Sequence, residues 1–584
     1  MYKRQVKYNS GSTDTEVEVT YYGSTVSTEY NPQFWAGSVE SQDAVSDWFH
    51  IENYKEKTTL VFTGWAYGSP WGEDVEIHHP GAVMSENEIK DATSDGKIHV
   101  YATWGYLQNY ETGLASAEII GGNEYTNIIL ISGGNNSASL DHVSAPFTIR
   151  SQIGQKAILY VYDREEFSSN VIIDNVYLQN RDNASPTNNH GDGYGYGLYA
   201  RGHTLILGTG VELPSNIDSA SIAPQVYGGS CEGTVQGSTD VIIHSGVFYN
   251  VVAGGYNCYI MGNTNLVMRG GTVLDTVVGG NSGGATNNNV IEGNTNVYMT
   301  GDVSLPGDYY EERQLDSQYS TGFMFSLNES TILTGGSNNG KINGNSNVHI
   351  SGSAELWDVQ GGGRRGDSSV SKATVTVSGN ALIKHVLCGS ITDGLDGTSG
   401  HGSSANDAEC VKDVEITIGD RAIVASVFGA GYDTYYAATY ASMVDGGTIS
   451  ITIKDSCTVG YVYGGGYRGT IGSEDKPIES ITINISGGTI LRDVFGGGRG
   501  GVDKILHNTD GTVYRNGSES ISDSTGFSKV YVNSINVSVS GGTICGSIYG
   551  GGESVPVLSS SVGVRDYRGN DGVASVDSKS ISVS

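Results

Sequence analysis

The chain has 584 residues and a formal net charge of −31, from 63 acidic and 32 basic residues. This acidic excess argues against binding to DNA or RNA, which needs cationic side chains that neutralise phosphates. Glycine contributes 85 residues, placed at regular turns, so the sequence indicates a stacked-repeat protein instead of one large globular core.

Residues 1–15 are polar, and we predict a loose N-terminus whose first five residues are similar to translated adapter sequence. Residues 16–104 contain three segments with the composition of strands, at 16–22, 60–65 and 99–104, and a Pro-Gly turn at 80–81. Phe62-Thr-Gly-Trp65, Pro80-Gly81 and Val100-Tyr-Ala-Thr-Trp104 resemble the internalin-type B-repeat, a small β-grasp-like module of bacterial surface proteins. The resemblance implies a spacer module over residues 16–104.

Residues 105–225 are predicted to form irregular first coils of a β-helix. Strands are expected at 126–132, 146–150, 156–162, 171–178 and 203–208, where β-branched and aromatic residues gather. Val171–Leu178 is similar to the strands of pectin-lyase-like β-helices, which implies that these entry coils belong to the same fold.

Between residues 226 and 584 one sequence motif recurs. Ser480–Gly501 shows it best: Ile481, Ile483 and Ile485 alternate with polar residues, a Gly turn follows, and a short strand leads to a second Gly turn. The distance between these turns is the same in three copies, from Gly488 to Gly496, Gly542 to Gly550 and Gly271 to Gly279. A strand unit at this period predicts an all-β, right-handed parallel β-helix, with loops of varying length leaving a fixed coil.

A Gly-Asn-Thr/Ser-Asn motif precedes several of the alternating strands, at 262–265, 293–296 and 344–347. Stacked coils would align these asparagines, and their side-chain amides could then hydrogen-bond one another along the stack. The final residues, 580–584, repeat such a strand and stop, so we expect the sequence to be cut short at both ends.

Aromatic residues share the slot after the β-branched residue of the short strand. They are Tyr227, Phe428, Tyr463, Phe495 and Tyr549. Strand alternation predicts an outward aromatic column, which could hold sugar rings, although such a column could equally be covered by loops or serve only to lock the coils. Arginines that follow Gly turns, Arg364, Arg365, Arg468 and Arg499, could add a basic strip suited to an anionic glycan.

Other motifs carry little weight. Arg365-Gly366-Asp367 spells an integrin-binding tripeptide, but three-residue matches arise by chance. Gly400-His401-Gly402 is similar to an element of polygalacturonases, yet Asp393 and Asp396 lie in a Gly-Ser loop and not on a strand, and glycoside hydrolysis needs paired carboxylates. We therefore predict no catalytic residues, no metal site and no cofactor.

Six cysteines show no metal-ligand spacing. Cys231 and Cys258 follow Gly turns on successive coils and could meet, while small buried hydrophobes are the main expectation for the set.

The resemblances imply a bacterial cell-surface or secreted adhesin-like protein that binds a polysaccharide, another glycan or an extracellular protein without catalysis. A signal and an anchor are not present in this stretch, and no membrane insertion is expected. Two alternatives stay open: a polysaccharide lyase or glycoside hydrolase on the same fold, and a phage or fibre subunit. Fold alone does not separate them, because function lies in the site.

Overall fold

The computed structural model consists of strands and their connections, with no α-helix in the part it describes, so the predicted all-β fold is confirmed. The structure describes residues 3–9, 14–21, 60–67, 93–94, 97–106, 109–112, 119, 121–124, 126–133, 136–137, 143–151, 156–181, 197–214, 223–283, 289–306, 331–338, 340–364, 368–389, 411–431, 447–466, 470–471, 477–499, 528–553 and 574–584. The chain divides into two compact units. Unit 1 comprises Met1–Ser230, Thr239–Tyr249 and Leu266–Thr272, and unit 2 comprises Cys231–Ser238, Asn250–Asn265 and Val273–Ser584.

Unit 1 begins with a five-stranded mixed sheet, the N-terminal sheet. Its strands are β1 (Lys3–Asn9), β2 (Asp14–Tyr21), β3 (Leu60–Tyr67), β4 (Thr93–Ser94) and β5 (Lys97–Tyr106). The order is β1-β2-β5-β3, with β2 and β5 parallel and β4 paired antiparallel to β5. Strands therefore occur at all three predicted places, and β1 also occupies part of the segment that was expected to be loose. The likeness to a B-repeat and the domain boundaries stay predictions.

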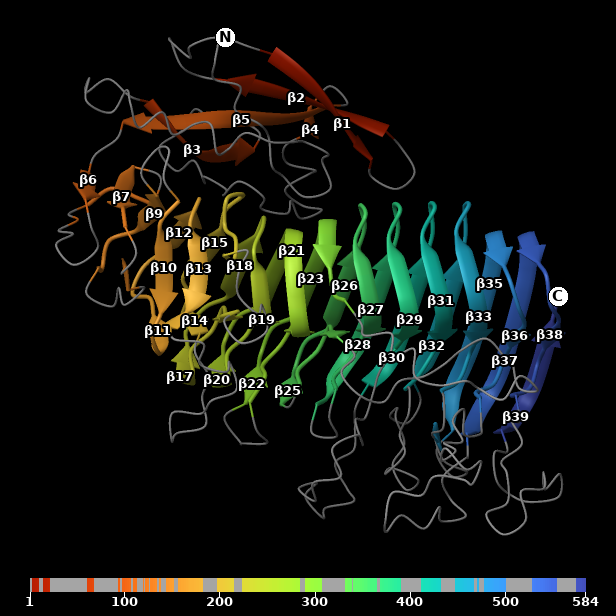
Figure 1. The fold of residues 1–584 in the computed structure, drawn as a ribbon. Coiled ribbons are helices and arrows are strands. Elements are labelled where there is room, and N and C mark those ends of the chain that lie inside the picture. Colours follow the sequence, from red (N-terminus) through yellow and green to blue (C-terminus); the bar gives the residue numbers. More distant parts are fainter. Residues whose placement is uncertain are drawn as a thin grey trace, which may run out of the picture. The chain divides into compact units, whose positions relative to one another are not determined.

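The remainder of unit 1 is built from three parallel ladders, in which each strand pairs with its equivalent from the next coil (Figure 1). The long-strand ladder contains β6 (Asn109–Thr112), β7 (Asn127–Ile131), β9 (Phe147–Ser151), β12 (Val171–Asp174), β15 (Thr204–Leu207) and β18 (Thr239–Ile243). The turn ladder contains β11 (Arg164–Glu166), β14 (Gly197–Tyr199) and β16 (Gln225–Tyr227), and the third ladder contains β8 (Asn136–Ser137), β10 (Ile158–Val161) and β13 (Tyr177–Asn180). Parallel pairing at each turn of the chain defines a parallel β-helix.

Unit 2 repeats the same plan. Its long-strand ladder contains β23 (Thr295–Ser304), β26 (Ser346–Ile350), β28 (Val370–Val377), β30 (Val411–Ile418), β32 (Thr448–Ile453), β35 (Ile478–Ile490), β37 (Ser528–Ile544) and β39 (Ala574–Val583). Its turn ladder contains the end of β21 (Thr264–Val278), then β24 (Ile332–Thr334), β27 (Glu355–Gln360), β29 (Leu382–Cys388), β31 (Ile423–Phe428), β33 (Thr458–Tyr463), β36 (Val494–Phe495) and β38 (Ile548–Tyr549). The third ladder holds β17 (Glu232–Val235), β20 (Asn257–Ile260), β22 (Val290–Ile291) and β25 (Lys341–Ile342), and β34 (Thr470–Ile471) pairs with β37. One further strand, β19 (Val247–Val252), completes the set.

The Gly turns that end the turn-ladder strands allow the coils to approach closely. A Cβ atom on Gly464 would lie 2.4 Å from the carbonyl oxygen of Gly496, well inside van der Waals contact. The Gly464 N–H donates to the Phe495 carbonyl at 2.8 Å, so the backbone pairing continues through the turn. Glycine is required here because no side chain fits between successive turns, which explains the fixed Gly positions of the repeat.

The predicted asparagine ladder is present in unit 2. The Asn296 amide donates to Asn265 Oδ1 at 2.9 Å, and the Asn347 amide donates to Asn296 Oδ1 at the same distance. The asparagine at the second motif position bonds the backbone instead, since Asn263 Oδ1 accepts the N–H of Asn294 at 2.8 Å. The hydroxyl between the two asparagines is buried, and Thr295 Oγ1 donates to the Gly335 carbonyl at 2.7 Å. The three polar residues of the motif thus form hydrogen bonds to three different partners.

Candidate binding surface

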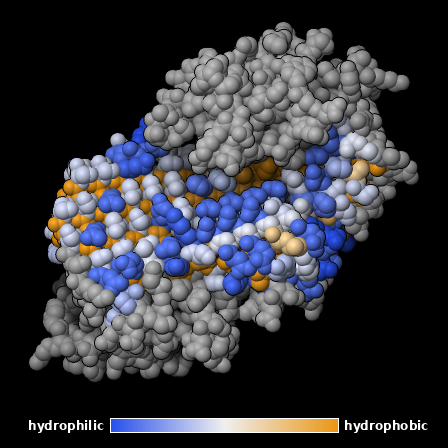
Figure 2. Space-filling view, turned by 180° about the vertical axis from the view of Figure 1, so that it is seen from behind, coloured by the Kyte–Doolittle hydropathy of each residue, from blue (hydrophilic) through white to orange (hydrophobic). Residues whose placement is uncertain are grey.

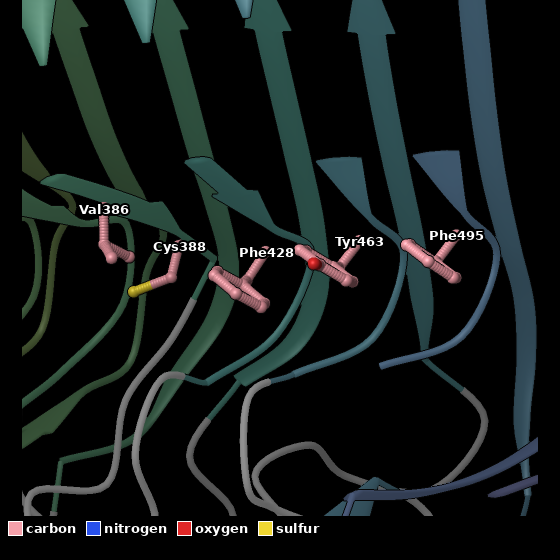
Figure 3. Packing of buried hydrophobic residues seen from close by; sticks show 5 residues of the cluster. All are labelled: Val386, Cys388, Phe428, Tyr463 and Phe495. Atoms are coloured by element: carbon pink, nitrogen blue, oxygen red, sulfur yellow. The ribbon is translucent and has the colours of Figure 1, made fainter. Parts of the chain in front are cut away.

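The aromatic rings of the predicted column stack on one another from coil to coil. In unit 2 the register pairs Cys388 with Phe428, then Tyr463, Phe495 and Tyr549 on successive turn-ladder strands. The ring centroids are 4.7 Å apart for Phe428 and Tyr463, 5.2 Å for Tyr463 and Phe495, and 4.8 Å for Phe495 and Tyr549. Figure 3 shows the buried side chains in one row with Val386 and Cys388. Tyr227, which occupies the same sequence slot, lies in unit 1 and stacks on Tyr199 at 4.4 Å.

The column is not displayed on the surface as expected. Phe428 and Tyr463 are each 1% exposed and Phe495 is 6% exposed, while Tyr549 is 47% exposed. Parallel stacking also covers the faces of the internal rings with neighbouring rings, so those faces cannot stack on a sugar. The geometry therefore favours the alternative role, in which the column locks coils together, and within the column it leaves Tyr549 as the accessible ring.

The hydroxyl of the buried Tyr463 has a specific partner. Its Oη donates to Glu553 Oε2 at 2.5 Å, and the same carboxylate oxygen lies 3.1 Å from Arg499 Nε. Burial, the largest cause, raises the pKa of Tyr463 well above its ordinary value. The group therefore stays a neutral donor, and the Tyr463–Glu553–Arg499 set fastens residues from three coils.

Only two of the four arginines of the predicted basic strip, Arg364 and Arg499, belong to the described residues. Arg499 pairs with Glu553, which neutralises its charge locally. Arg364 donates from its backbone N–H to the Ser337 carbonyl at 3.0 Å, and its Nη1 lies 3.5 Å from Thr276 Oγ1. Arg365 and Arg468 fall outside the described residues. A continuous strip of unneutralised arginines is thus not what the described coils present, and ligand binding by these residues stays a prediction.

A more accessible surface runs along the long-strand ladder of unit 2. In the middle of β26, β28, β30, β32, β35 and β37, one buried apolar residue lies between two polar residues that are at least partly exposed. We call these polar positions the polar face. In register they form one column of Asn347, Thr374, Glu415, Ser450, Thr482 and Asn536 and a second of His349, Thr376, Thr417, Thr452, Asn484 and Ser538.

The polar face has a regular geometry. Neighbours within a column are about 4.8 Å apart, and the two columns are separated by about 6.6 Å, twice the rise per strand residue. In the space-filling view, rows of hydrophilic and intermediate residues alternate with hydrophobic ones over part of the described surface, at the left of the picture (Figure 2). Strand alternation predicts the outward polar positions from the sequence, but their alignment into one surface depends on the register between coils.

Ion pairs lie on or next to the polar face. Glu415 has Thr374 and Ser450 at its own register position on the neighbouring coils, and Lys372 Nζ, one strand away, lies 2.6 Å from Glu415 Oε2. A second pair joins Lys384 and Glu355 on the neighbouring ladder. Both pairs are partly solvated, so each contributes little to stability, and both reduce the net charge that a ligand would meet.

A buried His–Asp pair was missed by the sequence analysis. His385 Nδ1 lies 2.7 Å from Asp358 Oδ1, which also accepts the Val386 N–H at 3.2 Å. Ser426 lies on the next coil, but its hydroxyl donates to the His385 carbonyl at 2.7 Å and not to the ring. A nucleophile has to bond its base, so these three residues do not have the arrangement of a catalytic triad. They tie three coils together instead.

Several other motifs noted in the sequence lie outside the described residues. The Arg365–Asp367 tripeptide, the residues around His401, and Cys410 lie outside the described residues. Cys231 and Cys258 are buried thiols that no disulfide joins. Within the described ranges, no three His, Cys, Asp or Glu side chains come close enough together to hold a metal ion. In the same part of the chain, no helix has the length and hydropathy needed to cross a membrane.

Comparisons with known proteins give no relative from which a function could be transferred. No family model, no curated protein and no solved structure matches this chain.

Proposed function

We propose that this protein is a non-catalytic binding protein that holds an extended polysaccharide along the polar face of unit 2. The supporting observation is the pair of columns of hydroxyl, amide and imidazole side chains, with the one carboxylate of Glu415, on six successive strands. Equivalent groups recur at each coil, so a polymer with repeating hydroxyl groups can make the same contact many times.

The energetics favour a long ligand. One hydrogen bond between a surface hydroxyl and a ligand contributes only about 0.5–1.5 kcal/mol net, because both groups give up water. Several such contacts on one polymer act together, since each later contact is intramolecular. A monosaccharide would therefore bind weakly, whereas a chain that spans several coils would be retained.

The setting of this function is also part of the proposal. The resemblance of residues 16–104 to a B-repeat and the net charge of −31 support an extracellular, adhesin-like protein at a bacterial surface. High net charge keeps such a repeat protein soluble and separates neighbouring copies. A carbohydrate-active enzyme on the same fold is the main competing function, and an extracellular protein is the competing ligand.

The test uses the whole chain on immobilised pectin, polyuronate, mucin and matrix proteins, with and without calcium. Retention and the appearance of new reducing or unsaturated chain ends are measured together. We expect retention on at least one polysaccharide and no new ends. Steady release of new ends would establish an enzyme, and retention on matrix proteins alone would move the ligand to the protein class.

A variant locates the surface. The triple change Thr376→Ala, Thr417→Ala and Thr452→Ala removes three hydroxyls from one column, and at about 0.5 kcal/mol or more each it should weaken retention at least about tenfold. Met261→Ala is the matched control, because Met261 is exposed but lies next to the third ladder. Equal retention by the triple variant and the control would move the site away from the polar face.

A further inference from the structure

The long-strand ladder of unit 1 has a feature that its fold alone does not explain. Its strands are buried on both faces, with every residue of β7, β9 and β12 buried. One face lines the interior of the coils, where Ile129, Ile149 and Ile173 are fully buried. The opposite face must therefore be covered by something outside the coils.

The covered face has an apolar centre. Register places Ile128, Thr148, Ile172, Ile206 and Ile242 in one column across five successive strands. None of the five is more than 5% exposed. Arg150 and Asp174 lie in the next outward column and are also buried. We call this surface, defined by the five-residue column and these two neighbours, the covered face.

The edge of this region is partly shielded from water, since His244 is neither fully buried nor fully exposed. His244 directly follows β18, and burial, with a smaller effect of Arg269, lowers its pKa well below the ordinary value for histidine. An imidazole on a solvated sheet surface would not be affected in this way.

The N-terminal sheet belongs to the same unit and has a matching apolar face. The register of β2 and β5 pairs Val17 with Ile98 and Val19 with Val100. On the other side of β5, Trp65 pairs with Ala102. Because strand residues alternate, these apolar positions of β5 share one face of the sheet. A sheet with one apolar face has to bury it against another layer.

The connection between the two parts is short. β5 ends at Tyr106 and β6 begins at Asn109, and β6 pairs in parallel with β7, so it already belongs to the coils. A tether of this length gives an effective concentration in the millimolar range, which makes even a weak apolar contact persistent.

We propose that the N-terminal sheet docks, through the face that carries Val19, Ile98 and Val100, on the covered face of the unit 1 coils. The occupant of this surface is then a segment of the same chain. In this arrangement the sheet closes the side of the first coils.

Site-specific photo-crosslinking on the full chain tests the proposal. A diazirine-bearing aliphatic residue replaces Ile206, and the matched control replaces Thr376, a half-exposed position on a long strand of unit 2. We expect adducts from position 206 to map to residues 3–106 within the same molecule, and position 376 to give mainly water-quenched product. Adducts only to residues 113–225, adducts between two molecules, or no adduct at all would each overturn the proposal.

A reciprocal probe guards against local misfolding. The same residue placed at Val19 should form adducts with residues 128–242, and Val100→Asp should abolish the cross-link from position 206. Hydrogen exchange of β30, far along the chain, is measured in each variant to confirm that the coils remain folded. A cross-link from position 206 to residues 3–106 that persists unchanged in Val100→Asp would overturn the assigned face.

Discussion

The long strands of the two units differ in how many of their faces are buried. In unit 1 the sequences Asn127-Ile-Ile-Leu-Ile131 and Val171-Ile-Ile-Asp174 are apolar at successive positions, and both faces are buried. In unit 2 the sequence Thr448-Ile-Ser-Ile-Thr-Ile453 alternates, and only every second residue is buried. One strand architecture can therefore serve two purposes: a face that another part of the protein covers, and a face that stays available to a ligand.

The largest expected effect comes from placing a charge on equivalent positions of the two ladders. Ile206→Asp should destabilise unit 1 by roughly 3–5 kcal/mol, because an unpaired carboxylate would be buried at a position that is 5% exposed. Thr376→Asp, on the half-exposed polar face, should change stability by less than about 0.5 kcal/mol. Hydrogen exchange measured by mass spectrometry reports the opening free energy of each ladder. Equal effects at both positions would remove the distinction between the units.

The aromatic column provides the next test. Tyr463→Ala should cost about 3 kcal/mol, because a buried ring that stacks on two neighbours is lost and Glu553 loses the hydroxyl donor, keeping only Arg499. Tyr549→Ala, at the exposed member, should cost less than about 1 kcal/mol, within the usual range for a surface change. Chemical unfolding followed by tyrosine fluorescence measures both. If Tyr549→Ala proves the more damaging, the column does not lock the coils as described.

Gly464, in a Gly turn of unit 2, is expected to tolerate no side chain. Gly464→Ala would place Cβ at 2.4 Å from the Gly496 oxygen, and relief of this clash by backbone movement should cost about 1–3 kcal/mol. Gly551→Ala is the control, because a Cβ there meets nothing within 4 Å. Thermal unfolding of the two variants gives the comparison, and identical melting curves would contradict the close approach of the turns.

A smaller effect is expected in the asparagine ladder. Asn296→Ala removes one amide that donates to Asn265 and accepts from Asn347, so about 1–2 kcal/mol should be lost. Thr482→Ala, further along the same column and beyond the three asparagines, should stay within about 0.5 kcal/mol of the parent. Exchange rates of the β23 and β26 amides are the measurement. Unchanged rates in Asn296→Ala would show that the asparagine ladder contributes nothing to stability.

The smallest expected effect is the pH dependence of stability, which should differ between the two units. Burial lowers the pKa of His244 in unit 1 well below its ordinary value, and lowers the pKa of His349 in unit 2. A lowered folded-state pKa means that the unfolded chain binds the proton more readily, so stability is present above about pH 6.5 and declines as the pH falls below it. Each histidine can contribute up to about 1.4 kcal/mol per pH unit.

The dependence should extend to lower pH in unit 1, since the pKa of His244 is lowered further. Hydrogen exchange of β18 and β26 between about pH 7 and pH 5, the range in which an ordinary histidine titrates, measures it, with His244→Gln and His349→Gln as the respective controls. A unit 1 profile that is flat in the parent protein would contradict the burial of His244.

The local features of the fold could be predicted from the sequence. The Gly turns need glycine because the coils approach closely, and strand alternation needs only neighbouring residues, so both could be inferred at positions such as Gly464 and Ile481–Ile485. The ladder of Asn265, Asn296 and Asn347 could also be inferred, because one motif at a constant place in each coil has to stack on itself.

Features that depend on more than one coil could not be predicted. Alternation assigned Phe495 to the face opposite Val494, but both are buried, because whether a face is covered depends on residues far away in the chain. The pairing of Lys372 with Glu415, and of His385 with Asp358, requires the register between coils joined by loops of different lengths. The repeating unit and its turns thus follow from the amino-acid sequence, because the same motif recurs in each coil and strand alternation involves only neighbouring residues. Which faces are buried and which side chains meet follows only from the folded chain, because both depend on register and coverage between coils.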